Sequence, residues 1–95
     1  MNIDYSPRSG GKTTRAIEWL RQNEKRLLLV FSNEEENRLK IAYPDVKNQI
    51  VDWDSYMEAK TRGQYFEECS IDNIDLILQK LVREPIKRIS ITEEL

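Results

Sequence analysis

The sequence predicts an α/β domain, a three-layer sandwich in which helices cover both faces of a mostly parallel sheet of about five strands. Two observations predict this fold. Short apolar runs that are typical of buried strands alternate along the chain with segments whose apolar residues recur at helical spacing. Prolines and glycines fall between several of these segments, where they are expected to end them. At 95 residues the chain is expected to form a single domain, residues 1–95.

The expected elements of the first half are, in order, a strand at residues 2–5, a helix at 13–23, a strand at 26–31 and a helix from 32 or 33 to 43. The run RLLLVF of the second strand is apolar after its first residue, which is typical of a strand buried on both faces of a parallel sheet. Ser32 or Asn33 can cap the next helix, and three glutamates follow, since the helix dipole favours acids in the first turn. Pro44 stops this helix.

The expected elements of the second half are a strand at 49–53, a short helix from residue 54, a weak strand at 65–72, a helix at 73–82 that Pro85 ends, and a last strand at 86–92. Isoleucine and leucine recur at helical spacing in NIDLILQKLV, with Asp72 or Asn73 as the N-cap. The last strand is predicted from the three isoleucines and the alternation of IKRISIT. Right-handed crossovers would place the carboxyl ends of all strands at one edge, where such folds bind ligands.

Composition excludes several classes of function. The net charge is -2 and the isoelectric point is about 5.2, so the chain lacks the basic excess of proteins that bind nucleic-acid duplexes. It has no histidine, which excludes imidazole zinc sites and a histidine base, and its one cysteine cannot form an intramolecular disulfide. No apolar run is long enough to cross a bilayer, and the N-terminus does not resemble a signal peptide. We therefore expect no membrane association and a cytoplasmic protein, in the host cytoplasm if the chain is viral.

The stretch SPRSGGKTT, residues 6–14, matches the phosphate-binding pattern G-x-x-x-x-G-K-[ST], except that a serine replaces the first glycine. In such loops, backbone N–H groups and the first turn of a helix surround a phosphate. Lys12 can reach the terminal phosphates, and the hydroxyl of Thr13 can ligate Mg²⁺. The predicted nucleotide-binding residues are Arg8, Ser9, Gly10, Gly11, Lys12, Thr13 and Thr14. A plain glycine turn before a surface lysine is the alternative, and the strand and helix on either side favour binding.

The segment SPRSGGKTTRAIEWL, followed by RLLLVFSNEEENRL, resembles the opening of P-loop NTPases of the helicase and phage large-terminase type. The chain is also similar to small phage-type P-loop proteins of about this length. The resemblance implies a single minimal P-loop NTPase-like domain that binds ATP with Mg²⁺. SIDNIDLILQKL resembles the Walker B region, which implies that Asp72 holds Mg²⁺ together with Thr13, and that Lys12 acts on the phosphates. Where the family has a catalytic glutamate this chain has Asn73, whose amide cannot accept a proton.

We therefore expect hydrolysis to be slow or absent, and the sequence leaves open whether the chain is a weak ATPase. Asp75, one helical turn further on, can substitute as the catalytic acid, but helix capping explains Asp72 and Asp75 equally well. Two other functions stay open. One is a degenerate P-loop in a non-catalytic phage accessory or inhibitor protein. The other is a nucleic-acid accessory module, which the acidic composition disfavours. Exposed sheet edges predict a homo-oligomer or a larger protein partner.

Overall fold

In the computed structural model, the residues described are Ile3, 11–59 and 66–92. Their elements are α1 (Lys12–Arg21), β1 (Arg26–Val30), α2 (Asn33–Ala42), η1 (Pro44–Gln49), β2 (Ile50–Asp52), α3 (Trp53–Ala59), β3 (Glu68–Ile71) and α4 (Ile74–Leu81). The short η1 is a 3-10 helix that leads directly into β2. Within these ranges, no helix has the length and apolar character needed to span a bilayer.

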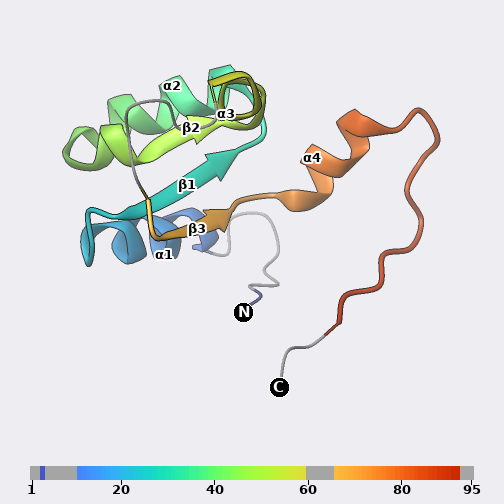
Figure 1. Ribbon diagram of the computed structural model, residues 1–95, viewed down its shortest axis with the longest axis horizontal. Coiled ribbons are helices and arrows are strands. Elements are labelled where there is room, and N and C mark those ends of the chain that lie inside the picture. Colours follow the sequence, from blue (N-terminus) through green and yellow to red (C-terminus); the bar gives the residue numbers. More distant parts are fainter. Residues whose placement is uncertain (1–2, 4–10, 60–65, 93–95) are drawn as a thin grey trace.

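The three strands form one parallel sheet in the order β2-β1-β3, with β1 in the centre (Figure 1). Leu28 of β1 lies opposite Ile50 of β2 on one side and opposite Ser70 of β3 on the other. Residues 27–30 of β1 are at most 3% exposed, as predicted for a strand covered on both faces. Because all three strands run in the same direction, their carboxyl ends meet at one edge of the sheet.

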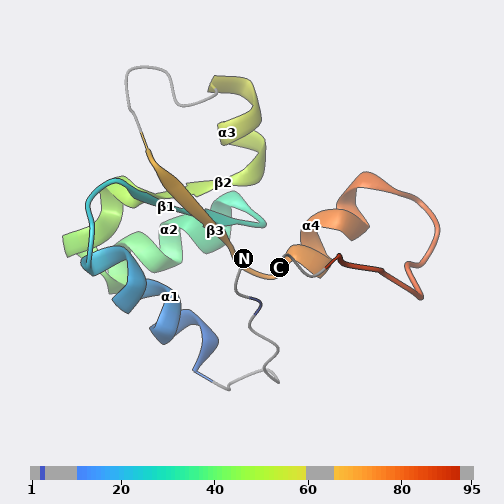
Figure 2. The same cartoon turned by 60° about the horizontal axis from the view of Figure 1, so that its bottom comes forward.

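Helices lie on both faces of the sheet (Figure 2). α1 and α2 lie on one face, together with η1, and α3 lies on the other. Between the first face and its helices is the main core, formed by Ile17, Leu20, Leu28, Val30, Leu39, Val46 and Ile50. Ile17 and Leu20 are fully buried in α1, as their helical spacing predicts. The predicted α/β class and the parallel sheet are therefore confirmed.

The starts of α2 and α3 follow from side-chain capping. Ser32 adopts extended backbone geometry, and its hydroxyl accepts a hydrogen bond from the Glu35 N–H at 3.1 Å, which confirms it as the N-cap of α2. α3 begins at Trp53, one residue earlier than predicted, because the Asp52 carboxylate accepts a hydrogen bond from the Ser55 N–H at 3.1 Å. α4 begins at Ile74, with Asn73 as its N-cap.

Of the five predicted strands, the described residues show three, at β1, β2 and β3. The first predicted strand, residues 2–5, falls outside the described residues except for Ile3. The last predicted strand, residues 86–92, is corrected, because this segment is described and forms no strand. α4 leads away from the sheet, so the segment that follows it has no strand beside it to pair with (Figure 1). Alternating isoleucines favour an extended chain, but a strand also needs a hydrogen-bonding neighbour.

Gln49 joins the end of α1 to the start of β1 and β2. Its side-chain amide nitrogen donates hydrogen bonds to three backbone carbonyls, those of Leu20 at 2.9 Å, Asn23 at 3.0 Å and Arg26 at 3.0 Å. Two of these carbonyls, at Leu20 and Asn23, lie at or just past the end of α1, where carbonyls lack helical partners. The Leu20 and Asn23 carbonyls also accept backbone hydrogen bonds, from Asn23 at 3.3 Å and Arg26 at 3.1 Å, so the Gln49 amide adds to a network that ties the helix end to the strands.

The first prediction tests this amide. Gln49→Leu keeps the approximate size of the side chain but removes its three hydrogen bonds to backbone carbonyls, so we expect the free energy of unfolding to fall by about 1–3 kcal/mol. Urea unfolding followed by circular dichroism measures this change. Gln22→Leu is the matched control: the Gln22 side chain accepts a single exposed hydrogen bond from Arg26, and its loss is expected to change stability by less than about 0.5 kcal/mol. Equal effects of the two substitutions would contradict the assigned role of Gln49.

Candidate functional site

The N-terminus of α1 begins the predicted phosphate-binding site. Gly11 is its N-cap, with φ 81° and ψ 9°, and no side chain of the described residues caps the helix. At this positive φ a residue with a Cβ is strained, and a Cβ would also lie 3.2 Å from the guanidinium of Arg15. As at any helix N-terminus, the first N–H groups of α1 have no acceptor within the helix, which is the arrangement that binds anions. Thr13 is half-buried and Thr14 exposed in this turn, while Arg8, Ser9 and Gly10 fall outside the described residues.

Lys12 reaches across the sheet edge to Asn73, the second residue after β3. Its Nζ donates a hydrogen bond to Oδ1 of Asn73 at 2.6 Å, joining positions 61 residues apart in the chain. Asn73 has φ 55° and ψ 52°, and its side chain makes no capping bond to α4. A left-handed conformation costs a non-glycine residue about 1–2 kcal/mol, and asparagine tolerates it best. The amide thus faces Lys12 instead of the helix that it precedes.

Asp72 lies between β3 and Asn73. It is 4% exposed, and its N–H donates to the Leu29 carbonyl at 3.0 Å, which extends the β3 ladder by one residue. Asp75 is exposed in the first turn of α4. The structure therefore brings Lys12 into contact with Asn73, the neighbour of the buried Asp72, whereas Asp75 faces solvent.

Two further buried carboxylates at the same edge, Asp52 and Glu36, are linked by a hydrogen bond that the sequence analysis does not predict. Asp52 ends β2 and is 3% exposed, and its N–H donates to Oε1 of Glu36 at 2.6 Å. Glu36 of α2 is 8% exposed, and its other oxygen accepts a hydrogen bond from Lys40 at 3.0 Å. We interpreted Glu36 only as a first-turn acid. Asp72 is predicted as a site residue because it follows a strand and precedes a helix. Asp52 has the same kind of position, between β2 and α3, so this pattern could have indicated it as well.

The environment of Asp52 favours its charged form. Burial raises the pKa of this carboxyl group, but hydrogen bonding with Ser55, Glu36 and Asn33 outweighs burial and holds the pKa below its ordinary value of 3.8. The pair joins α2 to β2 and caps α3, so its role in this structure is to hold the sheet edge together. Within the described residues, Oδ1 of Asp52 is buried without a hydrogen-bond partner.

The predicted Mg²⁺ ligands offer one hydroxyl, on Thr13, and one buried carboxylate, on Asp72. The described residues contain no cluster of three histidine, cysteine, aspartate or glutamate side chains that could hold a metal ion. Mg²⁺ usually keeps several waters and takes few protein ligands beside substrate phosphates. The donors that are present therefore fit Mg²⁺ carried with a nucleotide, and they do not form a dedicated metal site.

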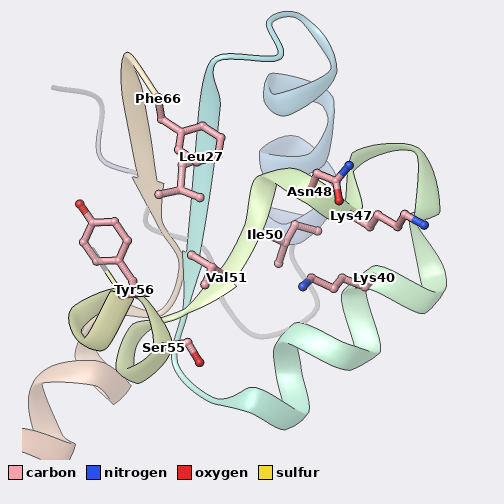
Figure 3. Close-up of a pocket in the computed structure, with 10 residues that line it drawn as sticks. Leu27, Lys40, Lys47, Asn48, Ile50, Val51, Ser55, Tyr56 and Phe66 are labelled. Atoms are coloured by element: carbon pink, nitrogen blue, oxygen red, sulfur yellow. The ribbon is translucent and has the colours of Figure 1, made fainter. Parts of the chain in front are cut away.

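A cavity of about 210 Å³ lies beside β2 (Figure 3), and Lys12 is not one of the residues that line it. Tyr56 and Phe66 lie near Leu27 on one side, and Lys40 and Lys47 extend from the other. Pockets for small molecules usually measure about 300–1,000 Å³, so this cavity falls below that range. We assign it no ligand.

Comparison of the chain with protein-family models, with curated protein sequences and with solved structures finds no match. The structure itself defines a small α/β protein with a three-stranded parallel sheet, and the function is argued from the residues at its carboxyl edge.

The second prediction concerns the pH dependence of stability through Asp52. Its pKa is lowered in the folded state, so its charge stabilises the fold above the ordinary value of 3.8, and this contribution is lost as the pH falls through the lowered pKa. Asp52→Asn keeps an oxygen for Ser55 but removes the charge. We expect wild type to be more stable than the variant at pH 7, and the difference to shrink below about pH 4.

Urea unfolding of both proteins from pH 7 to pH 3 measures this difference. Asp54→Asn is the matched control, because Asp54 is exposed and pairs only loosely with Lys80 at 3.5 Å. A difference between wild type and Asp52→Asn that does not change with pH would contradict the assignment.

Proposed function

We propose that the N-terminus of α1 and Lys12 bind the phosphates of a nucleotide, with ATP and Mg²⁺ as the ligand. The observation that supports this most is the 2.6 Å contact between Lys12 and Asn73. It holds the ammonium group beside the carboxyl edge of the sheet, near the first turn of α1. The partner of Lys12 is the neutral amide oxygen of Asn73. A hydrogen bond from lysine to a carboxylate would be stronger, because both groups would be charged. A phosphate therefore displaces the amide more readily than it would displace a carboxylate.

In this proposal the loop residues have separate roles. The N–H groups after Gly11 bind phosphate oxygens, and Arg8, Ser9 and Gly10 complete the loop around them. Thr13 and Asp72 hold Mg²⁺, which neutralises phosphate charge when it is bound. Lys12 moves from Asn73 to the terminal phosphates. Gly11 supports the proposal independently, since its positive φ is the backbone geometry that lets N–H groups turn towards an anion.

Hydrolysis is proposed to be slow or absent. A general base contributes about 10²–10⁴-fold to such reactions, and the amide of Asn73 cannot act as one. The amide oxygen also accepts the Lys12 hydrogen bond, so it faces the lysine rather than a free space for water. Asp75 is exposed in the first turn of α4 and remains the alternative acid.

The second candidate function is a non-catalytic accessory or inhibitor protein that acts by binding another protein. The observation that favours it is the apolar surface of α4. Ile74 is 47% exposed, Leu76 38% and Leu81 60%, so three large apolar side chains of this helix face solvent. Contiguous exposed apolar side chains mark interaction surfaces. A nucleic-acid accessory role is disfavoured by the net charge of -2.

The third prediction is that Lys12→Ala weakens nucleotide affinity by more than tenfold, or about 1.4 kcal/mol, without unfolding the domain. Titration calorimetry with ATP, ADP and GTP, each with and without Mg²⁺, measures the affinities. Lys47→Ala is the matched control, because Lys47 is exposed on η1, before the amino end of β2. If wild type binds no nucleotide and no inorganic phosphate at millimolar concentration, the proposed function is wrong.

The fourth prediction is that wild type hydrolyses ATP more slowly than about 1 s⁻¹, below the usual range of enzymes. Asn73→Glu supplies a carboxylate and should raise kcat. It should also raise KM, because the new carboxylate forms an ion pair with Lys12 in place of the amide contact. Steady-state kinetics separates the two effects, with Lys12→Ala as the control for contaminating ATPases. A wild-type rate of about 1 s⁻¹ or more would instead make Asp75 the first acid to mutate.

A further inference from the structure

The segment after α4 carries a strand pattern that its own fold does not use. Residues 86–92 are described without secondary structure, and Ile89 and Ile91 are 48% and 46% exposed. Lys87, Ile89 and Ile91 would share one side of an extended chain, since side chains alternate along a strand. Such a segment is expected to pair with a sheet edge, as burial of its isoleucines and pairing of its backbone both require a neighbour.

The β3 edge of the sheet offers such a neighbour. Within the described residues, β3 pairs with β1 alone, so its other side carries no described strand. Its side chains are mostly exposed: Glu68 and Cys69 face solvent, and Ile71 is 39% exposed. Cys69 and Ile71 lie opposite Leu27 and Leu29 in the sheet register, so their side chains share the apolar face of β1 that α1 and α2 do not cover. These two side chains continue that apolar face to the edge of the sheet, where both are exposed to solvent.

The two segments match residue by residue in a parallel register. If Lys87 lies opposite Glu67, then Arg88 lies opposite Glu68, Ile89 opposite Cys69, Ser90 opposite Ser70 and Ile91 opposite Ile71. Two lysine or arginine residues then meet two glutamates, and apolar residues meet apolar residues. An antiparallel pairing centred on Ile89 and Cys69 would set Lys87 against Ile71 and Ile91 against Glu67. Complementarity therefore favours the parallel register, which is also the direction of the other strands.

The same chain does not make this pairing. A parallel strand beside β3 must begin at the amino edge of the sheet, but α4 ends at the carboxyl edge. Lys80, near the end of α4, donates a hydrogen bond to the Phe31 carbonyl just after β1. Gln79 then holds the following chain against α4, because it donates to the Glu84 carbonyl at 2.9 Å and accepts from the Ile86 N–H at 2.9 Å. Figure 1 shows this part of the chain extending away from the sheet.

We propose that residues 86–92 of one copy pair in parallel with the β3 edge of a second copy, and that the exchange is reciprocal. Each copy gives its C-terminal segment and receives the other, so the dimer has a closed two-fold symmetry. The occupant of the edge is a second copy because the same chain holds both complementary sequences and cannot join them itself. The proposal does not depend on nucleotide binding.

The first experiment measures mass by light scattering at high micromolar concentration. Wild type is expected at twice 11.3 kDa, and the double variant Ile89→Lys with Ile91→Lys at 11.3 kDa. Ile41→Lys is the matched control, because Ile41 is an isoleucine of α2 with 82% exposure and should leave the dimer intact. A monomeric wild type, or a double variant that dimerises like wild type, would overturn the proposal.

The second experiment identifies the contact through Cys69, the one cysteine of the chain. A Cys69→Ser variant that also carries Ile89→Cys is mixed with wild type and oxidised. The expected product is a disulfide-linked dimer, since neighbouring strands lie about 4.7–4.9 Å apart, within the Cα separation of about 4.4–6.8 Å that a disulfide spans. The control is a Cys69→Ser variant that carries Ile41→Cys, which should give no disulfide-linked dimer with wild type. The single variant Ile89→Cys, which keeps Cys69, distinguishes pairing between two copies from pairing within one chain. A monomer with an internal disulfide as its main oxidation product would overturn the exchange.

Discussion

Burial of β1 is the constraint on which the rest of the structure depends. Its residues 27–30 are at most 3% exposed, so a strand of this composition is stable only with neighbours on both sides and cover on both faces. β2 and β3 supply the neighbours, α1 and α2 cover one face, and α3 covers the other. Parallel pairing follows from these crossovers and places every strand's carboxyl end at one edge. The candidate site lies at that edge because of this arrangement.

At the carboxyl edge, two polar contacts join elements that are distant in the sequence. Lys12 comes from the first turn of α1 and Asn73 from the end of β3, and Asp52 with Glu36 joins β2 to α2. These contacts differ in kind. The carboxylate pair satisfies backbone donors and a lysine, and so serves stability. The Lys12 contact uses a neutral acceptor and a left-handed backbone at position 73, which costs free energy that a purely structural contact does not require.

The β3 edge and the site share one strand. Asp72 and Asn73 follow β3 directly, and β3 is held in the described fold through β1 alone. A second copy paired along β3 would add backbone hydrogen bonds to this strand and restrict the motion of its carboxyl end. Dimerisation would then fix the positions of the residues proposed to face the nucleotide. Nucleotide affinity and dimer affinity would be coupled in that case, and the coupling is necessarily reciprocal.

The sequence by itself determined the local elements: the buried run of β1, the amphipathic α1, the Ser32 cap and the proline that ends α2. These depend on side-chain periodicity and on contacts within a few residues, both of which can be read along the chain. Only the tertiary structure decided the contacts of Lys12 with Asn73, of Asp52 with Glu36 and of Gln49 with three carbonyls, since each joins residues that the crossovers bring together. It also decided that residues 86–92 form no strand in their own chain. Alternation specifies which side chains share a face, but a strand forms only where another backbone lies beside it.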